Sequence, residues 1–450
     1  MQSQRPQRQR PQRRRAQRRS RAESALSIDD ASHSSEHLCT VSTDDASVLD
    51  AAALAAELAD DLLVGTVRDV HGAVSNRVYG VTDPAADATR MGQRIHDGVS
   101  KVVYTSLSAA LKASAKGLRL ASEVGMGSEM EATTRGRVVR AAINGLIGDR
   151  LRDEGSRCAF DIGVRVDGRD VVLDRAGVAA AYPAATDKLV VFVHGLSENE
   201  AYWNRAARPR TESRREQPDK RSYGDRLEGE GWTPVYLRVN TGLPIAENGV
   251  AMSALMVRLV ESWPGDIGRL ALVGHSMGGL IMRAACAVTT DSETPWTDLV
   301  TDVVCLGTPH LGAPLERVVH KGVAALGRVP EAAPFGRILE YRSTGILDLR
   351  HGLARDVQNL PNARYRLVSA TLARSPRSVT SSTLGDYFVP YASALGRLRN
   401  GEEMFPGAET LHVPSAHHFD LLNHDDIHAA IREWLHDRSD PPTKDESASP

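Results

Sequence analysis

The residues best suited to chemistry lie around Ser276, in the run Gly274-His275-Ser276-Met277-Gly278. This G-x-S-x-G pattern places a serine hydroxyl where flanking glycines permit a sharp turn. An apolar run precedes it at 270–273 and a helical pattern comes after it, so we expect a strand-to-helix turn. The N-terminus of that helix would direct free N–H groups toward the serine oxygen. The chemistry expected of such a serine is nucleophilic attack.

A serine nucleophile needs a base, and the base needs a carboxylate that orients it. For a serine at this kind of turn, the expected chain order is serine, then acid, then histidine. Asp386 follows the strand-like run 365–369 and is our predicted acid. Asp348 and Asp356 precede that run, and Asp420 is too close in sequence to the candidate histidines to orient them easily.

Several histidines compete for the role of base: His412, His417, His418, His424 and His428. His418 directly precedes Phe419 and the Leu421-Leu422 pair, which would anchor the loop and leave its ring facing the site. We predict His418 as the base, with His417 as the alternative. His424 and His428 are expected on the surface or at a helix cap.

The oxyanion formed in acyl transfer needs two hydrogen-bond donors. The N–H of Met277, directly after the nucleophile, is one predicted donor. The other is expected after the apolar run 189–193, where the sequence reads His194-Gly195-Leu196. Gly195 permits close backbone approach, so the Leu196 N–H is the second predicted donor.

Short apolar, β-branched runs after residue 155 must position these groups. They are 160–166, 171–173, 189–193, 235–239, 270–273, 303–306, 365–369 and 411–413. The tight Asp167-Gly168 turn predicts an antiparallel hairpin at the start. Helical patterns at 224–229, 246–262, 277–289 and 425–435 alternate with the later runs. The predicted fold class is therefore α/β, with an eight-stranded, mostly parallel sheet flanked by helices.

Composition divides the chain into four expected regions. Residues 1–45 are Arg-rich and then Ser/Asp-rich, and are predicted to be disordered, as is the tail at 438–450. Residues 46–155 show helical periodicity and are predicted to form an accessory helical region, either a bundle packed on the catalytic domain or a lipid- or partner-binding surface. Residues 156–437 are the predicted catalytic domain.

The charge of the chain is unevenly distributed. The 450 residues carry a formal charge of −2, but residues 1–22 hold nine arginines and no acid. The remainder has 46 basic and 57 acidic residues, a charge of −11. A basic tail could contact an anionic membrane surface or nucleic acid. The acidic body and the lack of aromatic residues in the tail disfavour nucleic acid.

Other classes are excluded by composition. Cys39, Cys158, Cys286 and Cys305 are too widely spaced for a metal site or a disulfide framework. No apolar stretch approaches the roughly 18 residues of a transmembrane helix, and the Arg-rich start lacks the apolar segment of an export signal. We expect a cytoplasmic protein, with a peripheral membrane contact through the tail left open, and the oligomeric state is not predicted.

These motifs together resemble the α/β-hydrolase superfamily, in the lipase-like branch related to GPI inositol-deacylases and bacterial lipases. Four elements carry the resemblance: 193–196, Gly274–Gly279, the run Gly-Thr-Pro-His-Leu-Gly at 307–312, and Asp386 with His418. The acid loop departs from the family pattern, because Tyr387 follows the aspartate where a smaller residue is common.

The resemblance implies a serine hydrolase for carboxylic esters, with Ser276 as nucleophile, His418 as general base and acid, and Asp386 as its orienter. The expected substrate is a small-molecule or lipid ester, and no metal or organic cofactor is implied. Acyl transfer to another alcohol, or thioester or amide cleavage, would use the same residues. Residues 312–361 correspond either to a lid over the site or to a structural excursion. A non-catalytic protein that binds anionic lipid or nucleic acid through its tail is the alternative from another class.

Overall fold

The computed structural model describes residues 46–60, 87–204, 221–289, 292, 294–313, 343–349, 352, 357–375, 385–398 and 400–436. For 87–99 the description is limited to the backbone. The predicted disordered segments 1–45 and 438–450 lie outside the described residues. So do 314–342, 350–351 and 353–356, which form most of the segment considered as a lid.

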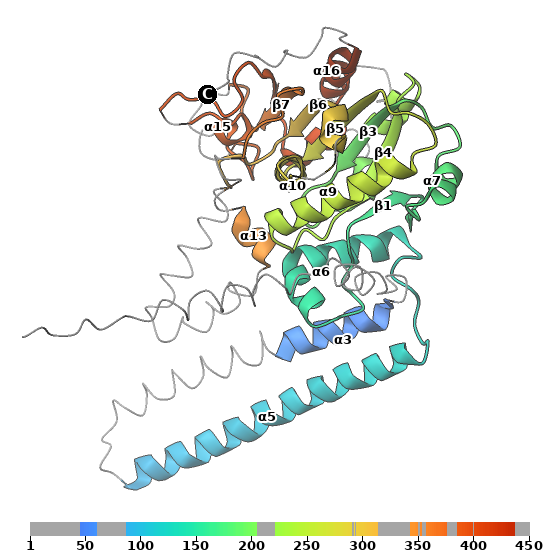
Figure 1. Cartoon of the computed structure of the whole chain (residues 1–450). Coiled ribbons are helices and arrows are strands. Elements are labelled where there is room, and N and C mark those ends of the chain that lie inside the picture. The colour runs from blue at the N-terminus through green and yellow to red at the C-terminus, as the bar shows by residue number, and fades with distance from the viewer. Residues whose placement is uncertain are drawn as a thin grey trace, which may run out of the picture. The chain divides into compact units, whose positions relative to one another are not determined.

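The centre of the structure is one mixed sheet of eight strands (Figure 1). The strands are β1 (Gly163–Val166), β2 (Arg169–Asp170), β3 (Lys188–Val193), β4 (Thr233–Arg238), β5 (Arg269–His275), β6 (Val300–Leu306), β7 (Arg364–Thr371) and β8 (Glu409–Pro414). Their order is β2-β1-β4-β3-β5-β6-β7-β8. β1 pairs antiparallel with β2 and β4, and all other neighbours are parallel. This confirms the predicted fold class, although the second strand is at 169–170 and not at 171–173.

Helices cover both faces of this sheet, as expected for parallel strands that are buried on two sides. The helices of this part are α7 (Arg175–Ala181), α8 (Tyr223–Glu228), α9 (Ile245–Ser262), α10 (Met277–Cys286), α13 (Thr344–Asp348), α15 (Tyr391–Ala394) and α16 (Asp425–His436), with short 3-10 turns at Glu200–Asn204, Trp296–Leu299 and His418–Leu422. The sequence patterns predicted neither α7 nor the short helices α13 and α15.

The two faces bury separate apolar clusters, because successive side chains of a strand point to opposite sides. In β3, Val191 belongs to one cluster and Phe192 to the other. Among the helices, α9 and α10 contribute most to the first cluster, whereas α8 and α16 contribute to the second. The sheet is therefore fixed from both sides, and its strand ends form a rigid edge for the loops.

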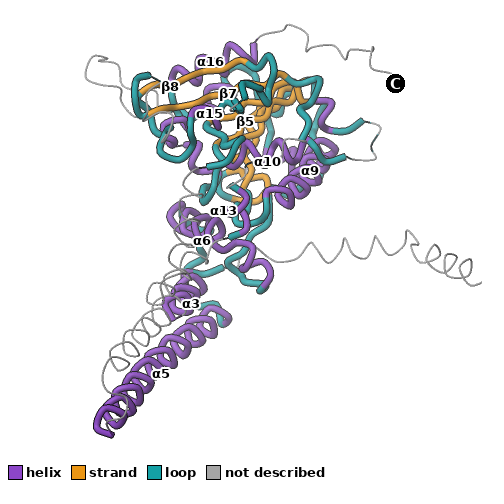
Figure 2. Tube along the Cα trace, turned by 90° about the vertical axis from the view of Figure 1, so that its left-hand side faces the viewer, coloured by secondary structure: helices purple, strands orange, loops and turns teal. Residues whose placement is uncertain are grey.

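Three described helices precede the sheet: α3 (Val48–Leu58), α5 (Asp87–Glu123) and α6 (Thr134–Asp153) (Figure 2). Leu54 of α3 and Leu151 of α6 are buried in a small core of their own, apart from the two sheet clusters. Inside α6, Ile147 leaves helical geometry (φ −142°, ψ 27°), which marks a kink. The division of the chain at residue 155 stays a prediction.

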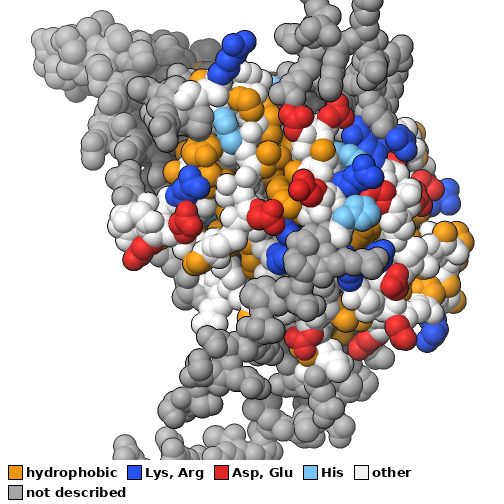
Figure 3. Space-filling view, turned by 90° about the horizontal axis from the view of Figure 1, so that it is seen from above, with side chains coloured by type: hydrophobic (Ala, Val, Ile, Leu, Met, Phe, Trp, Pro, Cys, Tyr) orange, Lys and Arg blue, Asp and Glu red, His pale blue; other side chains and the backbone are white. Residues whose placement is uncertain are grey.

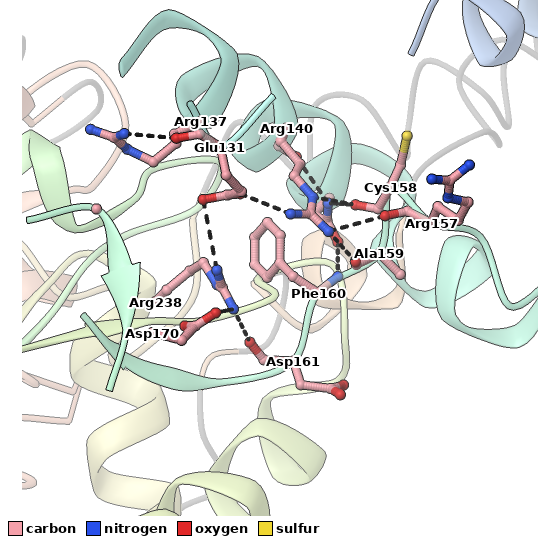
Figure 4. Close-up of polar contacts among 12 residues, drawn as sticks. Glu131, Arg137, Arg140, Arg157, Cys158, Ala159, Phe160, Asp161, Asp170 and Arg238 are labelled. Carbon is pink, nitrogen blue, oxygen red and sulfur yellow. Dashed lines mark hydrogen bonds and ion pairs between the residues drawn. The ribbon is translucent and has the colours of Figure 1, made fainter. Parts of the chain in front are cut away.

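An ionic network around three buried arginines joins the start of α6 to the antiparallel edge of the sheet (Figure 4). Glu131 contacts Arg140 at 2.8 Å and Arg165 of β1 at 2.7 Å. Asp170 of β2 pairs with Arg165 and with Arg238 of β4, both at 3.0 Å. Removing one member would leave buried charge unpaired, so the network ties the helical region to the sheet.

On the face seen in Figure 3, the described residues form no separate basic or acidic patch. There, Lys and Arg side chains lie among Asp and Glu side chains, with apolar atoms between them. In the part of the chain that the structure describes, no helix combines the length and apolar character needed to cross a bilayer.

Candidate active site

Ser276 occupies the sharp turn between β5 and α10. Its backbone has φ 53° and ψ −123°, which is strained for a residue with a side chain. Its N–H donates to the Leu306 carbonyl at 2.8 Å, at the end of the neighbouring strand β6. The residue keeps 9% exposure, so the turn is held firmly while the serine remains accessible.

The glycines of the motif allow the backbone of α10 to pack closely against β3 and β5 at this turn. A Cβ at Gly274 would lie 2.7 Å from the Gly279 nitrogen, and one at Gly278 would lie 2.8 Å from the Val193 carbonyl carbon. Real Cβ atoms do not approach this closely, so larger residues would push α10 away from β3 and β5. The two glycines thus have the steric role that the sequence suggested.

Asp386 and His418 meet after the ends of β7 and β8. Asp386 Oδ2 lies 2.7 Å from His418 Nδ1, and both residues are buried. The other carboxylate oxygen, Oδ1, accepts the N–H groups of Phe388 and Val389 at 3.0 and 2.8 Å. The His418 N–H also donates to the Asp386 carbonyl at 3.1 Å. The carboxylate is therefore held in one orientation toward the ring.

The His418 ring lies beside the Ser276 turn. A Cβ at Gly307, the residue after Leu306, would be 3.2 Å from His418 Cε1. The ring of His275 lies 4.6 Å from that of His418 between centroids. The His418 ring thus lies near His275, which directly precedes Ser276, and near Gly307, which follows the residue that accepts the Ser276 N–H.

The electrostatic environment of His418 favours its protonated form. Burial by itself lowers the pKa of the ring, but the Asp386 carboxylate, its hydrogen bond and the Glu198 carboxylate outweigh burial and raise the pKa above its ordinary value. A carboxylate paired with the far nitrogen of a histidine stabilises the imidazolium that forms when the ring takes a proton.

The two predicted oxyanion donors lie on either side of Ser276. Met277 is the first residue of α10, so its N–H has no acceptor within the helix. On the other side, a Cβ at Gly195 would lie 2.9 Å from Ser276 Cβ, so the Gly195-Leu196 segment touches the nucleophile. His194 is turned away from the site, because its Nε2 accepts the Val239 N–H at 2.9 Å.

The alternative residues are engaged elsewhere. His417 pairs with Asp420, with His417 Nε2 at 3.3 Å from Asp420 Oδ1. Asp348 accepts the Ile245 N–H at 2.8 Å. His424 Nδ1 accepts the N–H of Asp426, as expected of a helix cap. Asp356 lies outside the described residues.

Tyr387 stands where a smaller residue is common in the acid loop, and its backbone conformation explains that preference. Tyr387 has φ 89°, in the region that side chains rarely adopt, which explains why a smaller residue suits this position. The tyrosine is 61% exposed, so its side chain avoids the buried pair behind it.

One functional candidate was missed by the sequence reasoning. Glu198, three residues after Gly195, is buried and contacts both the Gly195 N–H and His275. The signal that could have identified it is a carboxylate within residues 194–198, the loop after β3 that carries the predicted donor Leu196 and is called the oxyanion loop below.

A partly open cavity is lined by other residues. It measures about 800 Å³ and its lining includes Arg165, Tyr182, Glu200, Trp232 and Tyr236, but none of the three residues predicted to react. The geometry around Ser276, and not this cavity, is what supports an active site.

A family model matches the central part of the chain. Residues 183–394 match the family described as "Putative serine esterase (DUF676)". The eight-stranded, mostly parallel sheet flanked by helices is an α/β-hydrolase fold. The match begins before β3 and includes Ser276 and Asp386, whereas His418 lies beyond its end. No curated protein matches the chain.

Solved structures similar to this chain include lipases and an esterase. A Bacillus licheniformis lipase in propeptide form is 18% identical over 58% of this chain and 52% of its own, with a TM-score of 0.41. The present chain thus spans about half the length of that lipase. A Pyrococcus furiosus esterase is 14% identical, over 56% of this chain and 82% of its own, with a TM-score of 0.37. Lipase 1 from Pelosinus fermentans is 13% identical, over 56% and 99%, with a TM-score of 0.34.

Proposed function

We propose that this α/β-hydrolase is a serine esterase that cleaves carboxylic esters through an acyl-enzyme on Ser276. The observation that carries the proposal is the buried Asp386–His418 pair, 2.7 Å apart, beside a serine held at φ 53°. A strained serine, an oriented imidazole and backbone donors on both sides are the parts that acyl transfer requires.

In the proposed reaction, His418 takes the proton of the Ser276 hydroxyl as its oxygen attacks the ester carbonyl carbon. The N–H groups of Leu196 and Met277 stabilise the resulting oxyanion. When the tetrahedral intermediate collapses, His418 gives the proton to the departing alcohol, and the acyl group remains on Ser276. Water, deprotonated by the same ring, attacks the acyl-enzyme, and His418 returns the proton to the Ser276 oxygen as the carboxylic acid is released. Asp386 keeps the ring in the required tautomer throughout.

Labelling with a fluorophosphonate probe tests the nucleophile. Wild type should be labelled and lose activity on nitrophenyl esters, whereas Ser276→Ala should show neither labelling nor activity above background. Ser262→Ala is a matched control, because Ser262 on α9 has the same 9% exposure and no part in the proposed site. Equal labelling of the Ser276→Ala protein would refute the assignment. A nitrophenyl series of increasing acyl length then separates a short-chain esterase from a lipase.

A further inference from the structure

A second histidine–carboxylate pair lies directly beside the proposed catalytic one. Glu198, in the loop after β3, and His275, the last residue of β5, are both buried. Glu198 Oε2 lies 3.0 Å from His275 Nδ1. Neither residue has a role in the proposed reaction, yet burying a carboxylate carries a desolvation cost that some interaction must offset.

Glu198 fixes the oxyanion loop through the same oxygen. Its Oε2 accepts the Gly195 N–H at 2.7 Å, and Gly195 directly precedes Leu196, the proposed donor. A charged acceptor makes such a hydrogen bond stronger than a neutral one. The position of the Leu196 N–H relative to Ser276 therefore depends on this carboxylate.

His275 also contacts His418, the proposed base. Its Nε2 lies 3.2 Å from the carbonyl oxygen of His418. Three successive contacts thus connect Gly195 to Glu198, Glu198 to His275, and His275 to His418. His275 directly precedes Ser276 in sequence. These contacts therefore connect the segments that carry the Leu196 N–H, Ser276 and His418, the three groups proposed to act on the ester carbonyl.

The carboxylate is charged in this position. Burial by itself raises the pKa of Glu198, but the neighbouring His275, its hydrogen bond and the Gly195 N–H outweigh burial and lower the pKa below its ordinary value. The groups facing His418 are Asp386 after β7, Glu198 after β3, His275 at the end of β5, and the rings of Phe388 and Phe419. Both carboxylates raise the pKa of His418.

We propose that Glu198 is a positioning residue for the esterase reaction, which holds the oxyanion loop and, through His275, the backbone of His418 in place around Ser276. The inference rests on the proposed function. Its charge also favours the imidazolium that His418 becomes as the serine is deprotonated. Glu198 therefore acts through its hydrogen bond to Gly195, through its contact with His275 and through its charge near His418.

Glu198→Gln is the decisive variant, because glutamine retains the size and an acceptor oxygen but removes the charge. We expect kcat on nitrophenyl acetate to fall about 10- to 100-fold with little change in KM, as for a misplaced catalytic group. The rate of fluorophosphonate labelling should fall in parallel. The acid limb of the kcat/KM–pH profile should move to lower pH, since a group that raises the pKa of His418 is lost. Glu198→Asp should recover less activity than wild type but more than Glu198→Ala.

Glu200→Gln is the matched control. Glu200 lies two residues further along and is also buried, but it faces Arg165 at 3.5 Å and Arg137 at 3.8 Å and not the site. Its kcat and pH profile should remain those of wild type, even if its melting temperature falls.

The outcomes separate the two proposals. If Ser276→Ala labels like wild type, the esterase proposal fails, whatever Glu198 does. If Ser276 is the labelled residue and Glu198→Gln reacts at the wild-type rate per folded molecule, only the positioning role is overturned. A Glu198→Gln protein that does not fold, judged by circular dichroism and thermal melting, also overturns it, because Glu198 would then be structural.

Discussion

Two parts of the N-terminal helical region differ in what they touch. α6 packs on the loops at the catalytic edge of the sheet: a Cβ at Gly145 would lie 2.8 Å from the Cα of Ser197, next to the Leu196 donor. Gly148 accepts a hydrogen bond from Asn240 at 3.3 Å, in the loop after β4. The described polar contacts of α5 instead include those to α3, such as Ser122 to Asp50 at 2.7 Å.

Although α6 lies outside the family match at 183–394, it touches the loop that carries the proposed oxyanion donor. α6 has one side in the small apolar core with α3 and another, glycine-bearing side against the oxyanion loop. Ser343 Oγ also donates to the Gly145 carbonyl at 2.7 Å, so a segment far along the chain meets α6 at the same place. We therefore treat α6 as a support of the active site and α3 with α5 as the peripheral part, and three substitutions test this contrast.

The largest loss of activity is expected for a substitution inside the proposed site, and the other two substitutions are compared with it. Asp386→Asn should lower kcat by about 10³- to 10⁴-fold, because an amide no longer fixes the tautomer of His418. Steady-state hydrolysis of a nitrophenyl ester measures it. Asp420→Asn, which alters the His417 pair, is the control and should change kcat less than about threefold. A reversed order would exchange the roles of His417 and His418.

An intermediate effect is expected where α6 meets the oxyanion loop. Alanine at Gly145 forces Ser197 to shift, and Ser197 already has φ 59°. We expect kcat/KM to fall about 10- to 100-fold, as misplaced catalytic groups do. Gly117→Ala on α5 is the matched change, since nothing lies within 4 Å of its Cβ position. That variant should keep full activity and gain up to about 1 kcal/mol from helix propensity. Equal effects of the two changes would remove the distinction between α6 and α5.

The smallest effect is expected at the contact between α5 and α3. Arg119 and Glu57 lie 2.6 Å apart but remain 50% and 36% exposed. Solvent screening limits such a pair, so Arg119→Ala should change the free energy of unfolding by less than about 1 kcal/mol and leave activity intact. Chemical denaturation followed by fluorescence measures this change. A loss above about 2 kcal/mol would mean that α3 and α5 stabilise the whole fold and are not peripheral.

Local patterns were sufficient to predict most strands of the sheet and to select the residues of the proposed triad. Seven of the eight predicted strand runs overlap the observed strands, because β-branched apolar residues and flanking turn residues act over a few positions. β2 was displaced, since a two-residue strand has no periodicity to detect. Ser276, Asp386 and His418 could be chosen because each follows a strand whose end must lie at the same edge of a parallel sheet.

By itself, the sequence determined the order of the candidate groups along the chain: a serine turn, then an acid loop, then a histidine loop, on an α/β scaffold. Only the tertiary structure decided which groups surround them. Glu198, His275 and His418 come from three separate segments, and Gly145 reaches Ser197 across 52 positions. No local pattern encodes such contacts, because they depend on how buried polar groups and close-packed backbones satisfy one another once the sheet has formed.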